Sequence, residues 1–162
     1  MADLISWTAN PKLRNYSGEA TYRKTIRLGA VDLRPGASVQ LEFGEGNPVP
    51  TPDPLPHFNM RAYLDSPVRE AAQVFINDEF AGYVWHPPFR VDIAPFLKPG
   101  KNDNRIVVGN TSINELAGEP LSKYRLFRDF YGVEFVPQDM QGLEPLPSGL
   151  RGPVSLVTSN PE

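Results

Sequence analysis

Hydrophobic and polar residues alternate along several short stretches of the chain. In residues 19–28, Ala20, Tyr22 and Ile26 lie on one face of an extended segment, and threonines and arginines lie on the other. Residues 38–43 alternate in the same way. A period of two is typical of a β-strand with one buried and one solvated face. We therefore expect strands over both segments, with their apolar faces in a common core.

Further short strands are expected at 61–65, 72–76, 80–85, 89–93, 104–108 and 152–157. Asn77-Asp78 lies between two of them, and this dipeptide favours a tight hairpin turn. The pattern also predicts a single helical turn at 94–97 and a turn at 99–102. Short strands at this spacing, without a long helical pattern, predict an all-β protein, an antiparallel β-sandwich.

Prolines show where the strand pattern is interrupted. The chain contains 18 prolines, and those from Pro48 to Pro56 occupy every second position. Proline lacks the backbone donor that a β-ladder needs, so this run predicts an extended surface loop. We expect one domain over residues 1–162, with loop excursions near 44–60 and 110–148.

Charge and composition exclude several classes of function. The net charge is −3, and acidic and basic residues are interspersed, whereas nucleic-acid binding usually needs a basic stripe. No apolar stretch is long enough to span a membrane, and the first residues lack the pattern of a secretory signal. The chain has no cysteine, which excludes disulfides and thiolate metal sites. We therefore expect neither nucleic acid nor a membrane as partner.

Several sequence blocks occur together in a known order. They are YSGEATYRKTIRL at 16–28, LEFGE at 41–45, AAQVFINDEFAGYVWHPPFRVDIAPFLKPGKNDNRIVVGNTSINELAGEP at 71–120 and SGLRGPVSL at 148–156. Together they resemble the galactose-binding-like β-jelly-roll domain at the C-terminal end of large bacterial glycoside hydrolases, in particular α-L-rhamnosidases of family 106 and family 2-like enzymes. The sequence departs from that pattern at Asn77-Asp78, where Asn-Gly is usual, and at Arg151, where an apolar residue is common.

The resemblance implies a function connected with carbohydrates. It implies a jelly-roll fold and a non-catalytic carbohydrate-binding or accessory module of a plant-polysaccharide-degrading enzyme, located outside the cytoplasm. Catalysis in such enzymes belongs to a separate (β/α)8 barrel, which needs at least about 200 residues. Glycans containing rhamnose or galacturonate are the implied ligands, and a catalytic glycoside hydrolase domain is the implied protein partner. No cofactor is implied, although such folds often hold a structural calcium ion in their loops.

Two groups of aromatic and polar residues could bind a sugar. An aromatic ring covers the apolar C–H face of a sugar, while polar side chains bind its hydroxyl groups. The first candidate group is Tyr83, Trp85, His86 and Arg90, and the second, in the long loop, is Tyr124, Arg125, Arg128 and Tyr131. A bidentate arginine would suit an acidic sugar.

Each group also has a structural interpretation. Trp85 could close the end of the sandwich by packing on Pro87, Pro88 and Phe89, and we favour this plug over a role as a sugar platform. The second group could instead dock a catalytic domain, together with Phe127 and Phe130. Asn114 and Glu119 are expected to hold loop geometry through hydrogen bonds to the backbone.

Two further functions remain as alternatives. The first is a purely structural domain that packs against a catalytic domain and binds no sugar. The second is an enzymatic chain that uses carboxylates such as Asp65, Asp92, Asp129 or Glu134, although scattered acids in a chain of this size always supply some pairs. No metal-ligand spacing or nucleophile motif supports enzymatic chemistry.

Overall fold

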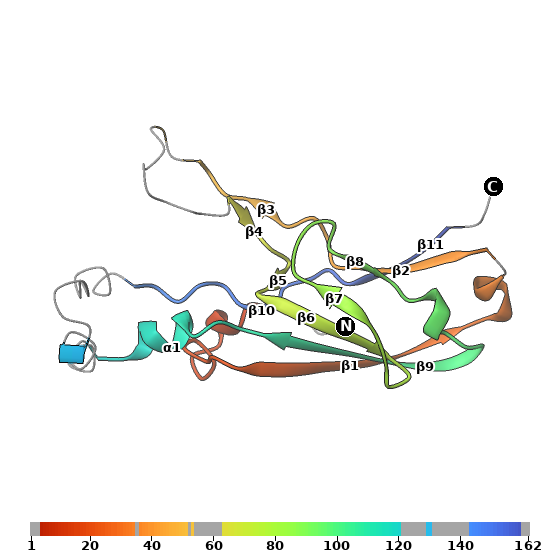
Figure 1. Ribbon diagram of the computed structural model, residues 1–162, viewed down its shortest axis with the longest axis horizontal. Coiled ribbons are helices and arrows are strands. Elements are labelled where there is room, and N and C mark those ends of the chain that lie inside the picture. The colour runs from red at the N-terminus through yellow and green to blue at the C-terminus, as the bar shows by residue number, and fades with distance from the viewer. Residues whose placement is uncertain are drawn as a thin grey trace.

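The computed structural model describes residues 4–34, 36–51, 53, 63–120, 129–130 and 143–159. Nearly all regular structure in this part of the chain is antiparallel β-strand, and its helices are short (Figure 1). The elements are, in order, η1 (Trp7–Ala9), β1 (Glu19–Leu28), η2 (Ala30–Leu33), β2 (Ser38–Glu42), β3 (Asn47–Pro48), β4 (Leu64–Asp65), β5 (Val68–Arg69), β6 (Ala71–Ile76), β7 (Glu79–Val84), β8 (Arg90–Asp92), η3 (Ala94–Phe96), β9 (Gly100–Gly109), α1 (Ile113–Gly118), β10 (Gly149–Leu150) and β11 (Ser155–Ser159).

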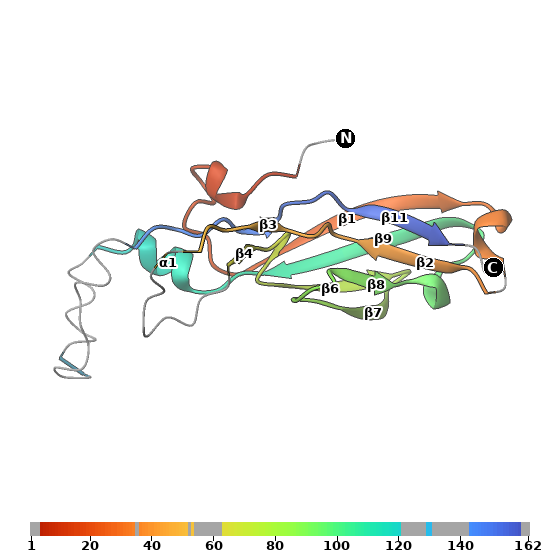
Figure 2. The same ribbon diagram turned by 90° about the horizontal axis from the view of Figure 1, so that it is seen from above.

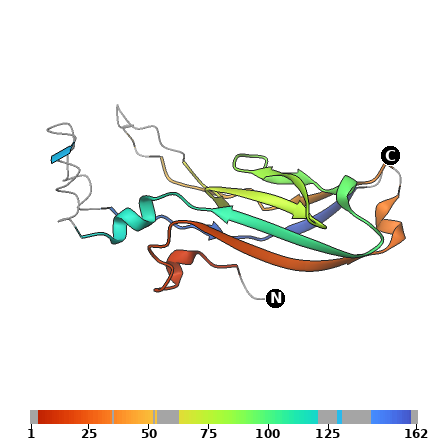
Figure 3. The same ribbon diagram turned by 60° about the horizontal axis from the view of Figure 1, so that its bottom comes forward.

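Two antiparallel sheets form the layers of a sandwich. The four-stranded sheet has the order β1-β9-β6-β7, and the three-stranded sheet has the order β11-β2-β8. Figure 1 shows the second sheet along one side of the elongated molecule, and Figure 3 shows β1, β9 and β6 side by side in the first. Two short ladders, β3 with β4 and β5 with β10, extend the fold at one end. The predicted antiparallel β-sandwich is confirmed, and the single domain over the whole chain stays a prediction.

The core consists of the alternating residues that the sequence pattern assigns to the inner faces. Val39 and Leu41 of β2 and Val74 and Ile76 of β6 are buried, as is Val108 of β9. Each fully buried side chain of this kind contributes about 1.5–3 kcal/mol relative to an exposed one. The hydrophobic alternation therefore fixes which face of each strand points inward and which faces the solvent.

The hairpin between β6 and β7 turns at Asn77-Asp78, as predicted. Both residues have positive φ, 52° and 67°, which is the geometry of a type I′ turn. The Asn77 side chain donates hydrogen bonds of 2.9 Å to Phe96 O and to Oδ1 of the buried Asn102. The predicted turn at 99–102 is wrong for most of its length, because β9 already begins at Gly100.

A buried tryptophan closes one end of the sandwich, but it is not the predicted one. Trp7 is 5% exposed, and its indole N–H donates a 2.6 Å hydrogen bond to the Tyr22 hydroxyl. A methyl group at Gly149 would lie 2.2 Å from that indole nitrogen, so the ring covers Gly149 closely. In Figure 2 the N-terminal segment, in red, lies beside the blue segment near the C-terminus, which contains β10. Trp85, by contrast, is 65% exposed, so its predicted role as a plug is wrong.

The two predicted loop excursions contain short regular elements. The first includes β3, which pairs with β4, and most of its proline run lies outside the described residues. The second begins with α1, where the buried Asn114 donates to Leu146 O and accepts from Leu146 N, both at 2.9 Å. These bonds confirm the predicted role of Asn114 in the loop. The role of the Glu119 side chain stays a prediction.

Candidate functional site

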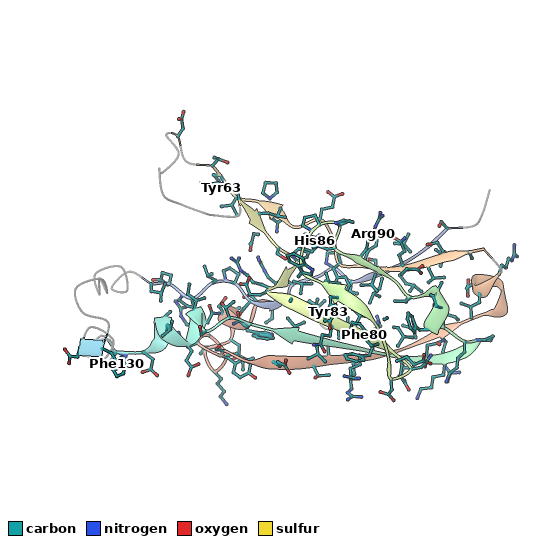
Figure 4. All side chains as sticks on the ribbon, in the orientation of Figure 1. Tyr63, Phe80, Tyr83, His86, Arg90 and Phe130 are labelled. Carbon is teal, nitrogen blue, oxygen red and sulfur yellow. The ribbon has the colours of Figure 1, made fainter. Side chains whose placement is uncertain are left out.

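Aromatic side chains gather on the outer face of the β6–β7 hairpin. Val74 and Val84 point into the core, so Phe75 and Tyr83, next to them in the sequence, point outward. Phe80 is an even number of residues from Val84, and it lies outside because the ladder shifts register between Val74 and Phe75 and pairs Phe80 with Phe75. Phe80 is 44% and Tyr83 62% exposed, and their ring centroids lie 4.7 Å apart. Phe75 of β6 meets Phe80 edge-on at 5.6 Å. Figure 4 shows Phe80 and Tyr83 together on β7. These rings form a solvent-accessible apolar platform.

The platform continues into the bend after β7. Trp85 follows the buried Val84, so it projects on the same side as Tyr83, into solvent. The indole meets the His86 ring edge-on, with 4.4 Å between centroids and an interplanar angle of 89°. His86 Nδ1 lies 2.6 Å from Pro87 O, and because a carbonyl only accepts, Nδ1 carries a proton. In the neutral ring, Nε2 is then a hydrogen-bond acceptor.

Arg90 adds a cation at the start of β8. Its side chain is exposed, and Figure 4 shows it on the same side of the molecule as His86. Arg90 N–H donates to Pro88 O at 2.8 Å, which fixes the backbone between the bend and the strand. We refer to Phe80, Tyr83, Trp85, His86 and Arg90 as the β7–β8 surface. It combines exposed ring faces with polar groups, the chemistry that recognises a sugar.

The second predicted group cannot be placed beside the first. Tyr124, Arg125, Arg128 and Tyr131 lie outside the described residues, as does Phe127. Phe130 is described, is highly exposed, and lies at the far end of the molecule from Tyr83 and His86 (Figure 4). Phe130 is therefore not part of the β7–β8 surface.

The carboxylates considered for catalysis have other contacts or lie apart. Asp92 Oδ1 accepts a 3.0 Å hydrogen bond from Ala94 N and so stabilises the start of η3. Asp129 adjoins Phe130 at the end of the molecule far from β8, whereas a glycosidase pair stands about 5–9.5 Å apart. Glu134 lies outside the described residues. Among the described side chains, no group of three or more histidines or carboxylates could hold a metal ion.

One carboxylate has a clearly perturbed pKa. The Thr25 hydroxyl donates a 2.8 Å hydrogen bond to Asp103 Oδ1, and this bond, with the nearby Lys101 ammonium, lowers the pKa of Asp103. The pair spans β1 and β9 on the solvent-facing side of the sheet. It is therefore a structural cross-strand contact.

Sequence analysis missed Phe75, Phe80 and Arg105 as neighbours of the candidate group. The Arg105 guanidinium lies 3.7 Å above the centre of the Phe75 ring, a cation–π contact. Alternation along the strands places Phe75 and Arg105 on an outer face, but it assigns Phe80 to the same face as the buried Val84. It does not give the cross-strand register that brings Phe75 opposite Phe80 and Arg105.

Comparisons with known proteins identify glycoside hydrolases. No protein-family model matches the chain. A rhamnosidase structure from Novosphingobium sp. PP1Y matches with a TM-score of 0.64 and 26% identity, over 97% of this chain and 12% of that one. A Formosa agariphila protein named "Putative beta-glucuronidase" is 27% identical over 119 residues, which are 72% of this chain and 8% of that protein. The chain thus resembles one small part of much larger glycoside hydrolases.

Proposed function

We propose that this chain is a non-catalytic accessory domain of a glycoside hydrolase and that its β7–β8 surface binds glycans. The observation that carries the proposal is the exposure of Tyr83 and Trp85, 62% and 65%, on the outer side of a well-packed sandwich. The resemblance to about a tenth of the rhamnosidase supports an accessory role. The chain has no room for a separate (β/α)8 catalytic barrel.

The exposed aromatic rings suit a polysaccharide better than a buried small molecule. Aromatic rings bury a large apolar area against the C–H face of a sugar without losing many rotamers. His86, whose ring meets that of Trp85, and Arg90, on the same side of the molecule as His86, add polar groups that can bind hydroxyl or carboxylate groups of a sugar. Binding on such an open surface is weak, because little area is buried and each hydroxyl must lose its water.

Rhamnose- and galacturonate-containing plant glycans are the proposed ligands. Arg90 is a fully charged donor that can bind a uronate carboxylate with two parallel hydrogen bonds. The name of the matching rhamnosidase agrees with a rhamnose-containing substrate of the larger enzyme. Degradation of such polysaccharides also favours a location outside the cytoplasm. Among the described residues, no helix is long and apolar enough to cross a membrane.

A purely structural domain is the second candidate function. The same exposed rings, with Phe130 at the far end, could be covered by another domain of a larger enzyme. This candidate is favoured by the small share of the rhamnosidase that the chain spans. It predicts that the isolated chain binds no polysaccharide.

Affinity electrophoresis against pectic and other plant polysaccharides separates the two candidates. We expect pectic glycans to retard the chain, and we expect Trp85→Ala and Tyr83→Ala to weaken retardation about tenfold or more. Phe130→Ala is the matched control, because it removes an exposed ring from the other end of the molecule and should bind as the original chain does. If no polysaccharide retards the chain, the structural candidate replaces the binding proposal.

A further inference from the structure

A polar pocket lies apart from the β7–β8 surface and is lined by none of the residues of that surface. It has a volume of about 320 Å³ and opens between the segment that leads into β3, strand β4 and the turn after β10. Figure 1 shows β3 and β4 on the side of the sandwich above β5. Its lining includes the apolar residues Leu4 and Pro153 and the polar side chains of Glu45, Asn47, Asp65, Ser66 and Arg151. The volume is within the range of small-molecule sites in proteins.

The Asp65–Arg151 pair is fixed in place before any ligand arrives. Arg151 forms an ion pair with Asp65 Oδ1, and Arg69 binds the same oxygen at 3.3 Å. Both side chains of the first pair are only about one-fifth exposed, 21% for Asp65 and 22% for Arg151. Arg151 N–H also donates to Pro67 O at 2.9 Å, which fixes its backbone. Since both ion pairs engage Oδ1, Oδ2 can still accept a hydrogen bond from a ligand.

The backbone around the pocket is shaped by glycines that bring it close to β4. Gly44 and Gly46 have φ of 87° and 82°, a region that favours glycine. A methyl group at Gly46 would lie 2.9 Å from Asp65 O, so the segment before β3 passes directly over the strand that carries the carboxylate. Glu45 and Asn47 flank this glycine and are exposed at the rim. The pocket therefore has a fixed floor and polar groups at its opening.

We propose that this pocket binds a neutral sugar residue. Carboxylates and an amide oxygen accept hydrogen bonds from hydroxyl groups, and a guanidinium donates hydrogen bonds to them, so the pocket can bind neighbouring hydroxyls on a pyranose ring. Leu4 and Pro153 supply an apolar wall for the C–H face. The formal charges at the pocket balance, because Glu45 and Asp65 are offset by Arg151 and by Arg69, which binds Asp65. Neither an anion nor a divalent cation is attracted by the balanced charges, so an uncharged ligand fits best.

This inference goes beyond the proposed function, because it concerns different residues and a ligand without charge. The β7–β8 surface presents Arg90 and favours an acidic sugar, whereas the pocket favours a neutral one. A polysaccharide that alternates acidic and neutral sugars could engage both. Either site can bind while the other does not, so the two proposals are tested separately.

The test is an NMR titration of the ¹⁵N-labelled 162-residue chain with neutral methyl pyranosides, including methyl rhamnoside and methyl galactoside. The backbone amides of Gly44, Gly46 and Gly152 are the reporters, because these glycines line the pocket. We expect at least one neutral glycoside to shift them at millimolar concentration, and galacturonic acid to shift them much less. A carboxylate-to-hydroxyl bond is strong enough that Glu45→Gln should weaken binding about tenfold, and Asn47→Ala should weaken it several-fold.

Both substituted residues are exposed at the rim of the pocket, so each variant should remain folded. Amide signals from outside the pocket that stay where they are in the original chain would verify that it does. Glu115→Gln is the matched control, since Glu115 is an exposed carboxylate on α1 that does not line the pocket, and it should leave the affinity unchanged. Absence of glycine shifts at tens of millimolar overturns the proposal. Equal binding of galacturonic acid, or an equal loss in Glu115→Gln, also overturns it. Trp85→Ala should leave the pocket titration unchanged even if the β7–β8 surface binds no glycan.

Discussion

Replacing Trp7 with alanine should destabilise the sandwich strongly, whereas replacing Trp85 should not. Trp7 is 5% exposed, its ring lies edge-on to Tyr16 with 5.5 Å between centroids, and its N–H binds the Tyr22 hydroxyl. Trp7→Ala removes the ring and leaves a cavity over Gly149. Large-to-small changes of this kind cost about 3–5 kcal/mol. That is a large fraction of the roughly 5–15 kcal/mol that keeps a domain folded.

Thermal unfolding followed by far-UV circular dichroism measures this cost. In a chain of this length each kcal/mol lowers the Tm by about 2–4 °C, so Trp7→Ala should lower it by about 6–20 °C. Trp85→Ala is the matched control, because it removes the same side chain from a site that is 65% exposed. It should change stability by less than about 0.5–1 kcal/mol, or about 1–4 °C. A larger loss for Trp85→Ala than for Trp7→Ala would refute the assignment of Trp7 as the plug.

Trp7→Phe separates the hydrogen bond from the packing. Phenylalanine keeps most of the ring volume but lacks the donor to the Tyr22 hydroxyl. That hydroxyl still accepts from Leu150 N at 3.3 Å, so we expect a loss of only about 0.5–1.5 kcal/mol. If Trp7→Phe were as unstable as Trp7→Ala, the indole N–H and not the buried ring would carry the stabilisation.

Three further predictions concern the fold. Gly149→Ala should destabilise the chain by several kcal/mol in a urea melt, because its φ is 86° and the added methyl would lie 2.2 Å from the Trp7 indole nitrogen. Asn114→Ala should cost about 1–3 kcal/mol in the same melt, because buried backbone groups lose their partner. Thr25→Val should raise the pKa of Asp103 in an NMR pH titration, since the hydroxyl bond lowers that pKa. A pKa that is lower in the folded state means that ionised Asp103 stabilises the fold. This contribution to the free energy of unfolding is present at pH values above the ordinary carboxyl pKa, and it is lost as the pH falls through the lowered pKa of the folded state.

The sequence pattern predicts the sandwich because each strand buries one face in the core, which requires apolar and polar residues to alternate along the strand. Val39 and Leu41 are buried as their spacing predicts, and Asn77-Asp78 forms the expected turn because asparagine and aspartate tolerate positive φ. The six-residue helix α1 was missed, since so short a segment shows no helical period. The pattern alone could not predict that Gly100 pairs with Leu28, because cross-strand register depends on residues far apart in the chain.

The candidate site was only partly predictable for a related reason. The sequence places Tyr83 and Trp85 on one side of a strand but does not say whether that side faces the core. Trp85 lies outside because Val84 takes the inner position. Trp7 comes from a segment with no strand pattern, and its partner Gly149 is more than a hundred residues away. Only the three-dimensional contact shows which tryptophan is the plug.

The most direct test of the central claim is acrylamide quenching of Trp85 fluorescence in the presence of glycan. The chain has two tryptophans, so in Trp7→Phe the only remaining indole is Trp85. Without ligand, acrylamide should quench this indole efficiently, because the side chain is 65% exposed. A pectic polysaccharide that binds the β7–β8 surface should reduce the quenching, and a polysaccharide that does not retard the chain should leave it unchanged. Unchanged quenching with a polysaccharide that does retard the chain would contradict the account, because the glycan would then bind elsewhere.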